Sequence, residues 1–146
     1  MKQWLMLVYK IPREPTAGRV YVWRKLQQLG AVLLQDAVWV LPYTSRTQHQ
    51  FQWLATEIEE IGGEATLWRS EFALDGQEEG LVQRFEAEVN ETYRQILKAL
   101  KGRKANLPAL ARQYQQAQAR DYFHSELGKQ VRQTLLAARG GSSGEE

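Results

Sequence analysis

The chain has 146 residues, of which 43% are apolar and 25% are charged, and its formal net charge is +2. These values are typical of a folded domain with a hydrophobic core and argue against a disordered chain. The sequence contains no cysteine, which excludes disulfide bonds, thiolate metal sites and thiol redox chemistry. The apolar segment at the amino terminus is too short to span a membrane or to serve as a secretory signal, so we expect a cytoplasmic protein.

Strand and helix signals alternate through the first part of the chain. Gln3–Ile11 is an almost continuous apolar run, which is typical of a strand in the middle of a sheet. Thr16 is the expected N-cap of a helix over Ala17–Leu29, and Gly30 is well placed to end that helix in a left-handed conformation. We therefore expect a strand followed by a helix.

The next elements repeat this order. Val32–Leu34 and Ala37–Leu41 predict two strands of a tight hairpin. Thr44 or Ser45 is the expected cap of a second amphipathic helix, which a pair of glycines ends. Glu64–Phe72 has the mixed polarity of an edge strand. The order strand–helix–strand, twice, predicts an α+β fold of the ferredoxin-like βαββαβ type, with a four-stranded antiparallel sheet and two helices on one face.

The second part of the chain predicts helices. Asp75 and Glu78 have the spacing of a capping box before a long amphipathic helix, and two further helical segments follow. The chain therefore divides into a ferredoxin-like core over residues 1–74 and a helical extension packed on it over residues 75–139. Residues 140–146 have the composition of a disordered tail.

Five tryptophans raise the possibility of aromatic contacts with a partner. Trp4, Trp39 and Trp68 lie within predicted strands, and Trp23 lies on the apolar side of the first helix, so we expect most of them in the core. Trp53 lies off the apolar stripe of the second helix. It is the candidate for a partner contact.

Charge is distributed unevenly. Residues 1–50 hold seven basic and two acidic residues. Residues 51–100 hold four basic and eleven acidic residues, and residues 101–146 hold eight basic and four acidic residues. Either two basic surfaces flank an acidic helical face, or the basic amino-terminal region meets an anion, which is nucleic acid or a small oxyanion. The candidate anion- or nucleic-acid-binding residues fall within sixteen positions and are Lys10, Arg13, Arg19, Arg24 and Lys25.

Catalytic and cofactor signatures are missing from the sequence. His49 and His124 are far apart and neither has a metal-ligating partner at helical spacing. There is no phosphate-binding loop motif and no serine in a nucleophile elbow. We therefore predict no catalytic residue, no metal site and no cofactor, and interpret the chain as a non-enzyme.

Three segments carry a family resemblance: LVYKIPREP (7–15), VWRKLQQLGAVLLQDAVWVLP (22–42) and FQWLATEIEEIGGEATLW (51–68). They resemble the N-terminal domain of ChrB-type chromate-resistance regulatory proteins, and the later ARDYFHSELGKQV (119–131) also resembles that family. The resemblance implies transcriptional control of a chromate-efflux operon, with chromate as the inducing signal. Members of the family continue into a second, C-terminal domain, so a separate domain of that type is one expected partner.

The strand–helix–hairpin segment resembles, more distantly, the middle domain of PaaX-type phenylacetate repressors, which in turn resembles the small CRISPR-associated adaptation endonuclease. In that endonuclease family the first strand ends in Tyr-Asp, and the aspartate holds a metal. The matching residues here are Tyr9 and Lys10, and a lysine repels a metal ion instead of binding it. The resemblance therefore implies a nuclease-like fold without nuclease chemistry.

Three hypotheses remain open at this point. The first is a regulatory module that acts on DNA or through a partner. The second is an oxyanion sensor in which Lys10, Arg13 and Arg19 bind chromate beside the start of the first helix. The third is a residual metal-dependent nuclease. A homodimer through the edge strand is a further expectation, and no membrane partner is expected.

Overall fold

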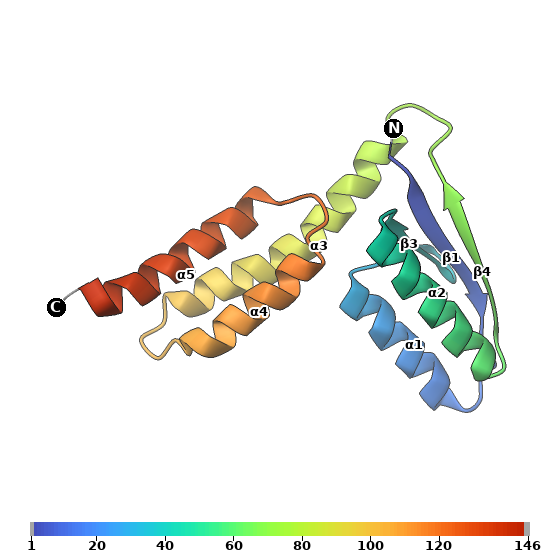
Figure 1. Cartoon of the computed structure of the whole chain (residues 1–146), viewed down its shortest axis with the longest axis horizontal. Helices are drawn as coiled ribbons and strands as arrows, with labels where there is room; N and C mark the ends of the chain where they lie inside the picture. Colours follow the sequence, from blue (N-terminus) through green and yellow to red (C-terminus); the bar gives the residue numbers. More distant parts are fainter. Residues whose placement is uncertain (1, 145–146) are drawn as a thin grey trace. The chain divides into compact units, whose positions relative to one another are not determined.

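A computed structural model of the chain describes residues 2–144, and the side chains of residues 2–140. The chain forms two compact units, Met1–Glu78 and Glu79–Glu146. All four strands belong to the first unit, and the helices that follow them make up the second (Figure 1). Among the described residues, no helix is both long and apolar enough to cross a membrane.

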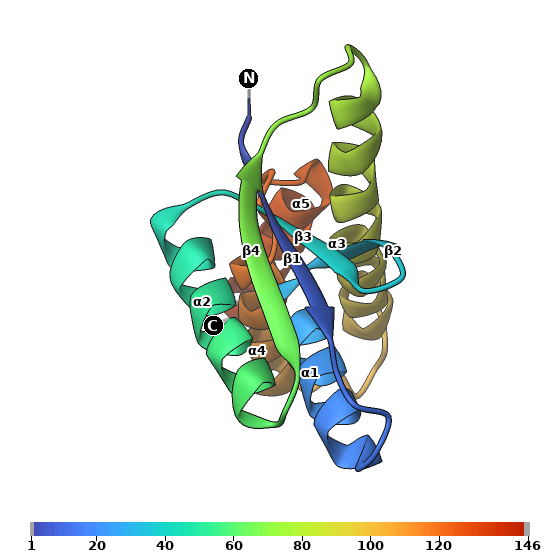
Figure 2. The ribbon, with the colours of Figure 1, turned by 90° about the vertical axis from the view of Figure 1, so that its right-hand side faces the viewer.

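The first unit contains one antiparallel sheet with strand order β2-β3-β1-β4. Its strands are β1 (Trp4–Lys10), β2 (Val32–Gln35), β3 (Val38–Pro42) and β4 (Glu64–Ser70). β1 pairs with β3 on one side and with β4 on the other (Figure 2). The apolar run is therefore the central strand and β4 is an edge strand, as their polarity patterns predict.

Two helices cover one face of this sheet, α1 (Thr16–Leu29) and α2 (Ser45–Glu60) (Figure 1). Each strand–helix–strand unit has a strand of the other unit between its two strands, which is the split βαβ arrangement. The predicted α+β class and the antiparallel sheet with two helices on one face are confirmed.

Local capping explains where these helices begin and end. Gly30 has a φ of 75°, and its N–H bonds the carbonyls of Gln27 and Leu26, as expected for a glycine that ends a helix. The Thr47 N–H donates to Thr44 Oγ1 at 3.0 Å, and the Thr44 N–H donates to Thr47 Oγ1 at 2.8 Å. This reciprocal capping box fixes the start of α2 and confirms Thr44 as its cap.

The core of the first unit consists of the apolar residues that the sheet and the two helices bury. Cross-strand partners Leu5 and Leu41 are buried, as is Leu7 on the same face of β1. Burial of such a side chain contributes about 1.5–3 kcal/mol relative to exposure. From the two helices, Val22, Leu26, Phe51, Leu54 and Ile58 are also buried.

Two predicted caps are wrong. Thr16 is the first residue of α1, and the N-cap is Pro15, which has an extended backbone and no side chain able to accept a hydrogen bond. The helix α3 (Gln77–Leu100) begins after Asp75. The Glu78 carboxylate accepts a hydrogen bond from Trp4 Nε1 at 2.8 Å, so a contact distant in sequence takes the group that the capping box would use.

The expectation that most tryptophans lie in the core is also wrong. Trp4 and Trp39 are buried, with 2% and 4% of their surface exposed, but Trp23 and Trp68 are 54% and 57% exposed. Trp23 follows Val22 directly, and one step along a helix rotates a side chain by about 100° away from the buried stripe. Trp68 pairs with Met6, so it lies on the face of the edge strand opposite to that of Leu7.

The second unit packs α3 against α4 (Leu107–Ala119) and α5 (Glu126–Gly144), and the three helices share one buried core (Figure 1). Asn106 caps α4, because its Oδ1 accepts from the Ala109 N–H at 3.2 Å. The predicted disordered tail begins inside the last turns of α5, and its residues 145–146 lie outside the described residues. The core of this unit consists of Val89, Tyr93, Ile96, Leu110, Ala117, Val131 and Leu135.

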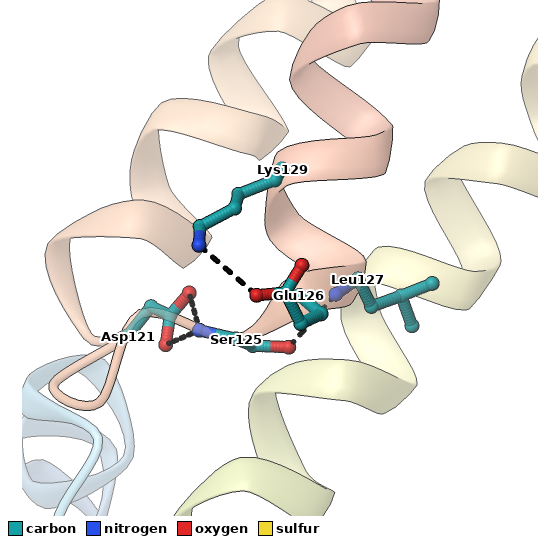
Figure 3. A network of polar contacts seen from close by, with 5 residues as sticks. All are labelled: Asp121, Ser125, Glu126, Leu127 and Lys129. Carbon is teal, nitrogen blue, oxygen red and sulfur yellow. Dashed lines mark hydrogen bonds and ion pairs between the residues drawn. The ribbon is translucent and has the colours of Figure 1, made fainter.

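A buried carboxylate holds the connection between α4 and α5. Asp121 is 8% exposed; its Oδ2 accepts from the Tyr93 hydroxyl at 2.9 Å, and both of its oxygens lie 3.1 Å from the Ser125 nitrogen. Figure 3 shows this carboxylate against the Ser125 amide, with the exposed Glu126–Lys129 ion pair beside it. The turn is therefore fixed by a polar network inside an apolar helical unit.

Alkaline pH should weaken this unit through Tyr93. Burial, together with the hydrogen bond to Asp121, raises the pKa of the Tyr93 hydroxyl in the folded chain. The stability that this hydroxyl contributes is fully present below about pH 10, the pKa of tyrosine in the unfolded chain. It is lost as the pH rises from there through the higher pKa of the folded chain. We expect the free energy of unfolding, measured by circular dichroism in urea, to fall between neutral pH and pH values above about 10. Tyr93→Phe should show a smaller fall, and an equal fall in both proteins would contradict the assignment.

Candidate functional site

A cavity of about 650 Å³ lies in the first unit, where the end of β1, the start of α1 and the β2–β3 turn meet. Lys10, Arg13 and Arg19 line it. Three of the five basic residues singled out from the sequence therefore converge on one hollow. The other lining residues are Tyr9, Ile11, Thr16, Val20, Trp23, Leu33, Asp36, Ala37 and Trp39.

The fold places the three cations through short, fixed connections. β1 ends at Lys10, which pairs with Glu64 on β4, and the connection to α1 contains two prolines, which restrict its backbone. Arg19 lies in the first turn of α1. The hairpin turn is held beside the end of β1, because the Tyr9 N–H donates to the Ala37 carbonyl at 3.3 Å.

The cavity carries a positive charge. Its three cations face one carboxylate, that of Asp36, which leaves a formal charge of +2. No side-chain hydrogen bond or ion pair joins Lys10, Arg13 or Arg19 to another of the described residues. The adjacent end of α1 has no side-chain cap, so its first N–H groups add further donors and a partial positive charge.

Tyr9 also lines the cavity. Burial raises the pKa of its hydroxyl, against the opposing effects of a hydrogen bond with Trp39 and of the positive charge of Arg19. The hydroxyl therefore keeps its proton at neutral pH. Tyr9 therefore adds a neutral hydrogen-bonding group to a lining that also contains Lys10, Arg13 and Arg19.

Part of the cavity lining is apolar and exposed. Thr16, Arg19, Val20 and Trp23 follow helical spacing along one face of α1, and Leu33 from β2 joins them. Val20, Trp23 and Leu33 are among the exposed large apolar residues of the chain. The lining thus combines three cations with exposed apolar side chains.

The remaining predicted residues lie elsewhere. Arg24 and Lys25 are on α1 but do not line the cavity, since they lie about 140° and 240° around the helix from Arg19. Trp53 is on α2, 70% exposed and away from the cavity. Sequence reasoning missed Tyr9 and Trp39 as lining residues, because each has the sequence context of an ordinary strand residue.

Metal chemistry finds no support in the side chains. Within residues 2–140, no group of three or more histidine, aspartate or glutamate side chains could hold a metal ion. Lys10 stands at the end of β1 and contributes a positive charge. The arrangement can neutralise and hydrogen-bond an anion with more than one negative charge.

Comparison with known proteins relates the chain to one family. The model of the family described as "Protein ChrB, N-terminal" matches residues 19–107, which is more than half of the chain and includes Arg19 but neither Lys10 nor Arg13. Protein ChrB of Cupriavidus metallidurans is 32% identical over 75 residues, which is 51% of this chain and 23% of that protein. The matched segment thus spans about a quarter of that relative. No solved structure gives a significant match.

Proposed function

The chain belongs to the ChrB N-terminal family, and from that premise we propose that it is a regulatory binding module of a chromate-resistance system, without catalytic activity of its own. Its role is to bind the oxyanion effector, chromate, and thereby to take part in chromate-responsive transcriptional control. The convergence of Lys10, Arg13 and Arg19 on one cavity supports this proposal.

The charges of the cavity suit a tetrahedral dianion. Its formal charge of +2 offsets the two negative charges of chromate or sulfate. Arginine presents paired N–H groups to oxyanions, and charge-assisted bonds of this kind are about twice as strong as neutral ones. The three cations have no side-chain partner within the described residues that a ligand would need to displace. A concave site favours a small anion over an extended nucleic acid backbone.

Charge reversal tests the site. Lys10→Glu or Arg13→Glu should weaken binding of chromate and sulfate, measured by titration calorimetry, by more than tenfold, because one charge-assisted bond is replaced by a repulsion. Arg24→Glu changes the net charge equally but lies on α1 outside the cavity. Arg112→Glu changes it equally in the second unit. Equal losses from all four variants would mean that only overall charge matters, and the site would be wrong.

Direct DNA contact is the competing mode of action. It would use the exposed Arg24 and the half-buried Lys25 as well as the three lining cations. In gel-shift experiments, the logarithm of the binding constant falls linearly with the logarithm of the salt concentration. Each substitution that removes a phosphate contact then reduces this slope by about one. A loss of DNA binding in Arg24→Glu, with chromate binding intact, would favour this mode.

We also propose that the chain pairs with a second copy through β4. This strand is an edge of the sheet formed by the described residues, and it carries the exposed Trp68. An edge strand offers unpaired backbone groups to another chain. Light scattering should give the mass of a dimer, and a monomeric mass at high protein concentration would contradict the pairing. A separate C-terminal ChrB-type domain is a further candidate partner.

Residual nuclease activity is not expected. Lys10 occupies the strand end where a metal-binding aspartate would be needed. Incubation with DNA or RNA and Mg²⁺ or Mn²⁺ should give no cleavage. Cleavage that persists through purification and is lost in Asp36→Asn or Glu14→Gln would overturn this expectation.

A further inference from the structure

The apolar lining residues of the cavity have no role in binding an inorganic oxyanion. A lone tetrahedral anion fills a small part of about 650 Å³, and cavities of about 300–1,000 Å³ accommodate organic ligands of drug size. Val20, Trp23 and Leu33 line the remaining space and are exposed in the free chain. Their exposed apolar surface is available to an organic ligand.

We propose that this cavity binds a mononucleotide. Its phosphate contacts Lys10, Arg13 and Arg19, and its base lies against Trp23. The inference extends the anion site of the proposed function. A phosphate monoester is a dianion of the same tetrahedral shape as sulfate or chromate, so the cations that would hold those ions also suit it.

The geometry of α1 places both halves of such a ligand on one helix face. Arg19 and Trp23 are one turn apart (i, i+4) and both line the cavity. Trp23 is 54% exposed, so its indole ring is accessible for stacking. Every nucleobase has a π-face, and stacking on an aromatic side chain contributes substantially to affinity.

The neutral hydroxyl of Tyr9 and the carboxylate of Asp36 complete the polar lining. Tyr9 donates to or accepts from ribose hydroxyls, and Asp36 accepts from them. A nucleotide offers this carboxylate the hydroxyl donors of its ribose, which an inorganic dianion lacks.

Titration calorimetry on the full chain with four probes tests the proposal: AMP, adenosine, ribose 5-phosphate and sulfate. AMP should bind about tenfold more tightly than any other probe, since only AMP combines the phosphate with a base. Trp23→Leu should weaken AMP binding about tenfold and leave sulfate unchanged. Trp53→Leu, the same substitution on an exposed tryptophan outside the cavity, should leave both unchanged.

The outcomes separate this inference from the proposed function. If sulfate and chromate bind but AMP binds no more tightly, or if Trp23→Leu has no effect, the nucleotide inference is wrong and the oxyanion site stands. If no anion binds, both are wrong. If adenosine binds as tightly as AMP, the cations do not hold the phosphate and the inference is wrong. If a single-stranded oligonucleotide binds without competition from AMP, the partner is a nucleic acid and the inference fails.

Discussion

Gly63→Ala should lower the free energy of unfolding of the first unit by about 3 kcal/mol, as expected for overpacking at a rigid junction. A Cβ atom at this position would lie 2.5 Å from the Lys10 carbonyl oxygen and 2.8 Å from Ile58 Cγ2. Neither neighbour moves freely. The Lys10 carbonyl belongs to the end of the central strand, and the Gly63 N–H bonds the Ile58 carbonyl at 2.9 Å.

Tryptophan fluorescence in urea gives a direct measurement, because all five tryptophans lie in the first unit. Gly80→Ala is the control: apart from its chain neighbours and the nearby backbone of α3, no heavy atom of the described residues lies within 4 Å of the position that its new Cβ atom would take. Alanine stabilises a helix interior by about 0.5–1 kcal/mol relative to glycine. That control should raise the stability of the second unit, read by circular dichroism. If Gly63→Ala is as stable as the original protein, the backbone around Gly63 moves to accommodate the new methyl group, and the prediction is wrong.

Asp121→Ala should lower the free energy of unfolding of the second unit by about 2–4 kcal/mol, because it leaves the Tyr93 hydroxyl and the Ser125 N–H buried without their acceptor. Glu126→Ala is a close control. It removes a neighbouring carboxylate that is 83% exposed and pairs only with Lys129 among the described residues, and exposed pairs contribute about 0–1 kcal/mol.

Tyr93→Phe separates the two lost bonds. It removes the hydroxyl donor but keeps the ring and leaves the Ser125 N–H bonded to Asp121, so about 1 kcal/mol should be lost. Urea unfolding followed by circular dichroism measures all three variants. Equal stability of Asp121→Ala and Glu126→Ala would contradict the structural role of the buried carboxylate.

Features that depend on neighbouring residues in the chain could be predicted from the sequence. Gly30 ends α1 and Thr44 caps α2, as their local chemistry predicts. The adjacent aromatic residues Tyr122 and Phe123 lie at the break between α4 and α5. Short-range patterns thus define the elements and their order.

Features that depend on tertiary geometry could not be predicted. The sequence predicts that Trp23 is buried with the other apolar residues of the first helix. In the structure it lies one residue after the buried Val22, is exposed and lines the cavity. Glu78 bonds Trp4, more than seventy positions away. The sequence shows the cluster of five basic residues. Only the structure shows that Lys10, Arg13 and Arg19 line one cavity, because this depends on the face of α1 that carries Arg19 and on where β1 ends.

The pairing of β1 has a consequence for biosynthesis. Within this sheet β1 is synthesised before the other three strands, yet each residue from Trp4 to Lys10 has its partner on β4, the last of the four. The hairpin β2–β3 can pair with β1 early, but one edge of this apolar strand stays open until residue 70 has emerged. Chains synthesise from the amino terminus at about 5–20 residues per second. The nascent chain therefore exposes an unpaired hydrophobic strand for several seconds, a period in which chaperones can bind it.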